Sequence, residues 1–243
     1  MRDIEIKTRD GTAKAAFVPP ASANGGKAAV ILYMDAFGPR PSLYGMAERF
    51  ADRGYAVLVP DLFYRFGTYG PFDAKTAFAN EQTGPTIRKM LAETTQEMTI
   101  RDSGAFLDAL SDNGATGPIG AVGYCMGGAR ALNAAGAYPD RIAAAASFHG
   151  GNLASDAPDS PAKRANSIKA RIYVGSAGVD NSFPPEQAAR LAEALRTAGV
   201  DHVIENYADM KHGWCVPDHG VYDEHGAERH WKRLLEFLEE TLS

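Results

Sequence analysis

Three side chains in this sequence have the types and the order needed for nucleophilic attack on a carbonyl group. Cys125 stands at the centre of a G-Y-C-M-G-G run at residues 123–128, and Asp180 and His212 follow it along the chain. A thiol nucleophile works with a histidine base, and the histidine needs a carboxylate to orient it. The order nucleophile, acid, histidine is typical of sites in which the nucleophile lies on a sharp strand-to-helix turn.

The residues around Cys125 predict such a turn. An apolar run at 119–123 has the length of a buried strand, and residues 127–137 form a helix rich in small residues. Glycines on both sides of the cysteine allow the backbone segments to approach closely, and the positive end of the helix macrodipole favours a thiolate. The alternative is that Cys125 is a small buried apolar residue, which is a common environment for cysteine.

Asp180 and His212 are each expected in a loop just past a strand, the strands being 170–174 and 202–207. Taken singly, Asp180 could cap the helix that starts at Pro184, and His212 could be a surface residue. Taken together, three loops at the carboxyl ends of strands meet at one edge of a parallel sheet, where such folds bind ligands. We therefore predict a Cys125–His212–Asp180 triad.

A fourth loop, at residues 35–38 with the sequence D-A-F-G, follows the apolar strand 27–33. In this architecture, that loop and the residue after the nucleophile each donate a backbone N–H to an oxyanion. We accordingly expect Ala36 and Met126 to be the two donors.

The elements that position these residues alternate between strand and helix. Buried apolar runs of strand length alternate with segments of helical periodicity, which is the pattern of a parallel sheet. The expected fold class is α/β, a doubly wound and mostly parallel sheet with helices on both faces. Neither a linker nor a repeat is evident, so residues 1–243 are expected to form a single domain. The further strands are expected at 3–8, 13–18, 55–59 and 142–148, and the further helices at 41–53, within 85–112, at 184–198 and at 227–241.

Composition narrows the function classes. Of 243 residues, 45% are hydrophobic, and the net charge is -5, which argues against nucleic acid and against anionic membrane surfaces. No apolar run approaches the ~18 residues of a membrane span. Two cysteines and no recognisable leader favour the cytoplasm. Nucleotide-binding motifs are absent and the histidine spacing fits no zinc pattern, so neither a cofactor nor a metal is expected.

At this point the sequence resembles the dienelactone hydrolase (carboxymethylenebutenolidase) family over nearly its whole length. The motifs that carry the resemblance are D-A-F-G at 35–38, P-D-L at 60–62, G-Y-C-M-G-G at 123–128, S-F-H-G-G at 147–151, the Asp180 loop, and K-H-G-W at 211–214. The resemblance implies an α/β-hydrolase fold, Cys125 as nucleophile, His212 as base and Asp180 as its orienting acid. It also implies a carboxylate near the thiol at position 35.

Two positions depart from the family pattern. Well-known members carry Glu where this chain has Asp35, and they hold the substrate carboxylate with arginines, one of them four residues after the histidine, where this chain has Val216. The candidate replacements are Arg40, Arg65 and Arg88. For the other possible pocket residues, Phe37, His149 and Trp214, the alternatives are packing or a hydrogen bond to the loop backbone.

The expected function is hydrolysis of a small ester or lactone through a thioester acyl-enzyme, by a monomer or homodimer whose partner is the small-molecule substrate. Two other classes stay open. One is a redox- or electrophile-sensing protein that uses the same thiol, and the other is a non-catalytic, ligand-binding member of the fold. The order of the three triad residues argues against both.

Overall fold

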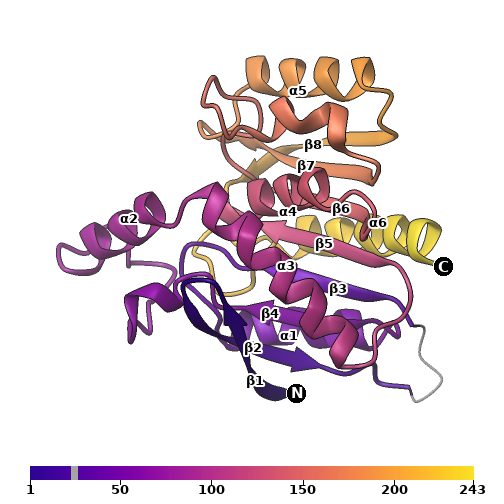
Figure 1. The fold of residues 1–243 in the computed structure, drawn as a ribbon. Coiled ribbons are helices and arrows are strands. Elements are labelled where there is room, and N and C mark those ends of the chain that lie inside the picture. Colours follow the sequence, from indigo (N-terminus) through magenta and orange to yellow (C-terminus); the bar gives the residue numbers. More distant parts are fainter. Residues whose placement is uncertain (23–26) are drawn as a thin grey trace.

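The structure is a computed structural model that describes residues 1–22 and 27–243, and its centre is an eight-stranded sheet in the order β1-β2-β4-β3-β5-β6-β7-β8 (Figure 1). Strand β2 pairs antiparallel with β1 on one side and with β4 on the other, and all the other pairs are parallel. The strands are β1 Arg2–Thr8, β2 Gly11–Val18, β3 Ala29–Tyr33, β4 Ala56–Pro60, β5 Ile119–Tyr124, β6 Ile142–Phe148, β7 Arg171–Val179 and β8 His202–Lys211.

Helices cover both faces of this sheet, as the sequence predicted. Helices α1 and α6 share one face, where the Phe50 ring packs on Trp231 with centroids 5.0 Å apart. Helices α3 and α4 pack together on the other face, on which η2 and α5 follow (Figure 1). The helices are α1 Pro41–Ala51, α2 Thr83–Glu93, α3 Gln96–Asp112, α4 Met126–Ala137, α5 Pro185–Thr197 and α6 Glu224–Leu242, with 3-10 turns η1 Tyr64–Phe66 and η2 Pro161–Ser167.

The central strands are buried along their whole length because helices lie on both sides of them. Every residue of β3, β4 and β5 is buried, which is why these strands read as unbroken apolar runs and not as alternating patterns. Strand β1, at the edge, alternates exposed and more buried positions instead. These three strands therefore form the centre of the core, and the predicted site residues follow the carboxyl ends of β3 and β5.

Strands β7 and β8 run further than the sequence predicted. Periodicity placed their ends at residues 174 and 207, whereas the structure continues them to Val179 and Lys211, which pair with each other across an irregularity after Ala177. The correction has a simple cause: residues 175–179 and 208–211 are mostly small or polar, so they do not continue the run of large apolar side chains that is typical of a buried strand. As a result, Asp180 and His212 directly follow paired residues.

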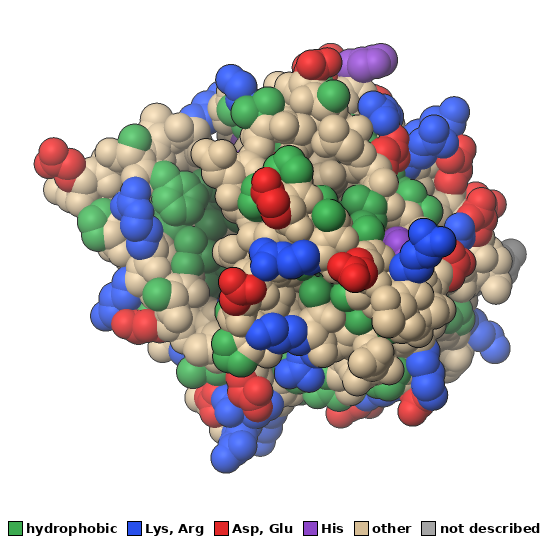
Figure 2. All heavy atoms as spheres, turned by 90° about the horizontal axis from the view of Figure 1, so that it is seen from above, with side chains coloured by type: hydrophobic (Ala, Val, Ile, Leu, Met, Phe, Trp, Pro, Cys, Tyr) green, Lys and Arg blue, Asp and Glu red, His purple; other side chains and the backbone are tan. Residues whose placement is uncertain are grey.

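The segment expected to be helical from 85 to 112 forms two helices, α2 and α3, that are separated at Thr94 and Thr95. Helix α2 projects beyond the carboxyl-terminal edge of the sheet (Figure 1). On the face shown in Figure 2, basic and acidic side chains are interspersed, in keeping with the small net charge. None of the helices in the described part of the chain is both long and apolar enough to cross a membrane.

Candidate active site

Cys125 sits on the sharp turn between β5 and α4. Its backbone is left-handed, with φ 55° and ψ −121°, a conformation that a residue other than glycine rarely adopts. The flanking glycines make the turn possible: a Cβ on Gly123 would lie 1.9 Å from the Gly127 carbonyl oxygen, and one on Gly127 would lie 2.4 Å from the Tyr33 carbonyl oxygen. The side chain of Cys125 is therefore presented at the carboxyl edge of the sheet, at the start of a helix.

His212 and Asp180 meet directly, although 32 residues separate them in the sequence. His212 Nδ1 and Asp180 Oδ2 are 2.7 Å apart, and the other oxygen of Asp180 accepts hydrogen bonds from the backbone N–H and the hydroxyl of Ser182, at 2.8 and 2.7 Å. Burial would raise the pKa of Asp180, but the bonds from His212 and Ser182 lower it below its ordinary value. The carboxylate thus stays ionised beside the imidazole.

The same contacts act on His212. Burial would lower the pKa of its imidazole, but hydrogen bonds to Asp180 and to the Cys125 side chain, together with their charges, raise that pKa to about 10. The imidazole therefore holds a proton more strongly than an ordinary histidine does, because of the carboxylate on one side and Cys125 on the other. Such a proton can be delivered to a leaving group.

The loop after β3 lies against the start of α4. Asp35 shapes the loop by accepting the backbone N–H of Phe37 at 3.0 Å, and Gly38 turns it with φ 80°. Among the residues that the structure describes, the backbone N–H groups of Ala36 and Met126 donate to no protein acceptor. Two N–H groups on adjoining segments are thus left without a protein acceptor among the described residues.

Asp35 has partners other than the thiol that the resemblance implied. The carboxylate is fully buried and takes two parallel hydrogen bonds from Arg40, at 2.7 and 2.8 Å, and one from His219 Nε2 at 3.0 Å. Burial would raise the pKa of Asp35, but His219 and Arg40 lower it below its ordinary value. Together with the bond from the Phe37 N–H, these bonds occupy both carboxylate oxygens. The charge of Asp35 therefore binds Arg40, His219 and the backbone of its own loop.

Aromatic rings form a continuous wall beside His212. Phe37 contacts Phe78 and His219, each with ring centroids 5.3 Å apart, and His149 contacts His212 at 4.8 Å and Trp214 at 5.3 Å (these rings come from four separate segments). Of these side chains, Phe78 is partly exposed, while the others are more deeply buried. Figure 2 shows a hollow with hydrophobic side chains next to the lobe that carries α2. The side of the site next to His212 is therefore lined largely by aromatic rings.

Comparison with known proteins gives the family. A model of the dienelactone hydrolase family matches residues 14–242. The chain belongs to the dienelactone hydrolase family. Carboxymethylenebutenolidase of Rhodococcus opacus is 26% identical over 246 residues, which span 99% of this chain and 92% of that protein. The resemblance seen in the sequence is thus confirmed.

Solved structures give the fold. A dienelactone hydrolase-like promiscuous phosphotriesterase from metagenomic libraries superposes with a TM-score of 0.81 at 24% identity, covering 100% of this chain and 98% of that one. The acylaminoacyl peptidase of Pyrococcus horikoshii superposes with a TM-score of 0.70 at 18% identity, covering 99% of this chain and 41% of that one. The expected α/β-hydrolase fold is confirmed.

The arginines that could replace those of other dienelactone hydrolases differ in their partners. Arg40 is held between Asp35 and Asp218, with bonds of 2.6 and 2.8 Å to the second carboxylate. Arg65 binds Asp10 and Asp102. Arg88 is exposed, donates to the Phe78 carbonyl at 3.1 Å, and has no carboxylate partner among the described residues. Of the three, Arg88 has the guanidinium that can still pair with an anion.

Three residues of this site escaped the sequence reasoning. Phe78 lies in the irregular segment before α2, and Asp218 and His219 lie in the segment after His212. No motif marks them, and their partners are far away in the sequence: Asp218 is 178 residues from Arg40.

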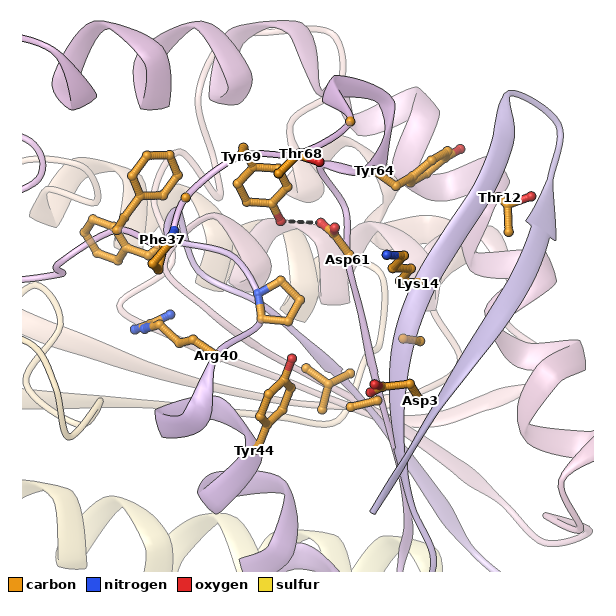
Figure 3. Close-up of a pocket in the computed structure, with 18 residues that line it drawn as sticks. Asp3, Thr12, Lys14, Phe37, Arg40, Tyr44, Asp61, Tyr64, Thr68 and Tyr69 are labelled. Carbon is orange, nitrogen blue, oxygen red and sulfur yellow. Dashed lines mark hydrogen bonds between the residues drawn. The ribbon is translucent and has the colours of Figure 1, made fainter.

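A separate cavity of about 520 Å³ lies on the β2–β4 side of the loop after β3 (Figure 3). Phe37 and Arg40 contribute to its wall, but Cys125, His212 and Asp180 do not. Tyr69 crosses it with a 2.5 Å hydrogen bond to Asp61. Within residues 1–22 and 27–243, His, Cys, Asp and Glu side chains form no group of three arranged to hold a metal ion.

Proposed function

We propose that this protein hydrolyses small esters or lactones, with Cys125 as nucleophile, His212 as proton carrier and Asp180 as the residue that orients it. The observation that carries the proposal is the hydrogen bond between His212 Nδ1 and Asp180 Oδ2 at 2.7 Å, on an imidazole whose pKa is also raised by Cys125. Membership of a hydrolase family supports the reaction class.

In the first half of the reaction, the Cys125 sulfur attacks the carbonyl carbon and the carbonyl oxygen becomes an oxyanion. The N–H groups of Ala36 and Met126 stabilise that charge, an effect of about 3 kcal/mol per donor in a comparable site. When the carbon–oxygen bond to the leaving group breaks, the imidazolium of His212 protonates the departing alkoxide. The product is a thioester on Cys125 and a free alcohol, or the ring-opened chain of a lactone.

Acylation then changes the state of His212. The pKa of His212 is raised in part by the charge and hydrogen bond of Cys125. A thioester has neither, so the imidazole left neutral after it gives up its proton can act as a base. It takes a proton from water while the water oxygen attacks the thioester carbon, and it returns that proton to the departing sulfur. Asp180 stays ionised throughout.

The decisive test is release of chromophore from an activated acetyl ester by the wild type, Cys125→Ala and, as a matched thiol control, Cys215→Ala. Cys215 is fully buried, so its loss should leave the reaction intact. A burst followed by turnover in the wild type and in Cys215→Ala, absent from Cys125→Ala, is the expected result. Equal release by all three proteins would overturn the proposal.

Two other results would also overturn it. Reversible oxidation of Cys125 under mild peroxide, without turnover of any ester in a panel of esters and lactones, would indicate a sensing thiol. Ligand binding that is unaffected by Cys125→Ser, again without turnover, would indicate a non-catalytic member of the fold. Each result is distinct from a narrow substrate range, because a narrow range leaves at least one ester hydrolysed.

A further inference from the structure

His149 immediately follows β6 and has an unusual backbone. Its φ is 39°, in the left-handed region that residues other than glycine seldom enter, although asparagine, aspartate and histidine do so more often than the rest. Its own N–H donates to the Gly175 carbonyl at 2.9 Å, which ties this conformation to β7. The side chain is completely buried. Strain of this kind persists only where the surroundings enforce it, and it concentrates at functional sites.

The side chain of His149 bonds directly to the backbone of the nucleophile. The Cys125 N–H donates to His149 Nδ1 at 3.1 Å and also reaches the Phe148 carbonyl oxygen at 3.1 Å. A ring nitrogen that accepts a hydrogen bond must be unprotonated. The bond therefore requires a neutral imidazole with its proton on Nε2.

The surroundings of His149 favour that neutral form. Burial, followed by the charges of His212, His219 and His230, holds the pKa of His149 well below its ordinary value. Its Nε2 is buried and has no protein partner among the residues that the structure describes. The ring also packs against His212, with centroids 4.8 Å apart. A single side chain thus contacts both the backbone of the nucleophile and the ring of the base.

We propose that His149 is a positioning residue that fixes the Cys125 backbone through its Nδ1 lone pair. The bond holds the strained turn in the one orientation that directs the sulfur toward His212. The neutral Nε2–H tautomer is part of the device, because protonation of Nδ1 would abolish the acceptor. The inference rests on the proposed function, in which Cys125 is the nucleophile.

Two substitutions separate the acceptor from the bulk of the ring. In His149→Asn, the amide oxygen lies about where Nδ1 lies, and asparagine tolerates the left-handed backbone. In His149→Gly the backbone is unstrained, but the acceptor is gone. His225→Asn, on an exposed histidine of α6, is the matched control. Unfolding curves for each variant show whether it is folded at the assay temperature.

The measurement is the rate of Cys125 alkylation by iodoacetamide, located by peptide mass spectrometry. We expect His149→Gly to react about 10- to 100-fold more slowly, since a small misplacement of a reacting group has effects of that size, and His149→Asn to stay within about threefold of wild type. His225→Asn should match wild type. Equal slowing in the Asn and Gly variants, or wild-type rates in both, would overturn the proposal.

A second measurement does not depend on the variants. Nitrogen NMR of ¹⁵N-histidine-labelled wild type should show His149 with an unprotonated Nδ1 and a protonated Nε2 from about pH 6 to about pH 8, the range in which an ordinary histidine titrates. Titration of His149 in that range, or the opposite tautomer, would overturn the proposal. Neither measurement needs ester turnover, so a failure of the proposed function, seen as no hydrolysis, is distinguishable from a failure of this inference.

Discussion

Arg40 and Asp35 form two parallel hydrogen bonds at the base of the loop that carries Ala36, and both side chains are nearly or completely buried. On its other side, the same guanidinium binds Asp218, in the segment that follows His212. One arginine thus fastens the loop of the expected oxyanion donor to the segment of the expected base. In this chain the carboxylate of Asp35 therefore acts through Arg40 and His219, which it binds, to hold these two segments together.

Replacing Arg40 by methionine should therefore destabilise the protein strongly. The substitution keeps most of the side-chain volume but leaves the Asp35 charge buried without its guanidinium, and breaking a buried pair costs about 3–5 kcal/mol. Urea unfolding at neutral pH measures the change. The matched control is Arg49→Met, because Arg49 and Glu228 are 40% and 54% exposed and such a pair contributes only about 0–1 kcal/mol. Similar losses in the two variants would contradict the assignment.

The pH dependence of the Arg40→Met effect has a definite sign. In the wild type the pKa of Asp35 is lowered, so its contribution to stability is present at neutral pH and is lost as the pH falls through that lowered pKa. Without the guanidinium, burial acts with less opposition and the carboxylate protonates more readily. The difference in stability between wild type and variant should shrink as the pH falls below about 4. A constant difference would indicate lost packing alone.

His212 should titrate far above the usual range, and Cys125 should be part of the reason. The pKa of His212 is raised to about 10 by Asp180 and Cys125. In Cys125→Ser the thiol contribution disappears, so we expect the His212 ring to titrate at lower pH in an NMR titration, while Asp180→Asn should lower its pKa as well. An unchanged His212 pKa in Cys125→Ser would show that the thiol and the imidazole are not coupled.

The raised pKa of His212 also determines how the stability of the fold should vary with pH. A histidine whose folded pKa is raised stabilises the fold fully below its unfolded pKa of about 6.5, and this contribution is lost as the pH rises through the folded value. Wild type should therefore lose stability between about pH 7 and the folded pKa of about 10 more steeply than Asp180→Asn. Thermal unfolding across this range measures the slopes.

Arg88 should distinguish charged substrates from neutral ones. It lies beside Phe78 at the aromatic wall and has no carboxylate partner among the described residues. Arg88→Leu should raise KM for an ester with a carboxylate on its acyl group by about two- to tenfold, since the pair would be partly exposed, and leave KM for the neutral ester of similar size unchanged. Lys89→Leu, on the neighbouring exposed lysine, is the control. Equal effects on both esters would remove Arg88 from substrate binding.

How far the sequence predicts this site depends on how local each interaction is. The turn at Cys125 is encoded within six residues by its glycines, and the order of Asp180 and His212 along alternating strands was enough to place them at one edge. The pairing of Val179 with Lys211, which brings Asp180 and His212 together, was not predicted because the small and polar residues at the ends of β7 and β8 break the apolar pattern of these strands.

The partners of Asp35 show the limit of sequence reasoning. Its position after β3 follows from the sequence, but its bonds depend on Arg40 folding back over a tight turn and on His219, which is 184 residues away. Neither the bond to Arg40 nor the bond to His219 belongs to a sequence motif with a fixed spacing. The same holds for His149, whose role depends on which ring nitrogen meets the Cys125 N–H. Tertiary contacts decide these pairings.

His212→Ala should convert the reaction into a trap. With an activated ester, the thiol can still be acylated, but no imidazole is left to activate water, so the thioester should accumulate. Intact-mass and peptide mass spectrometry would then show one acyl group on Cys125, which is partly exposed and so can be reached, and none on the buried Cys215. Cys125→Ala/His212→Ala should show no adduct. Turnover by His212→Ala without any adduct at Cys125 would mean that the ester is cleaved by direct attack of water, and the covalent mechanism would be wrong.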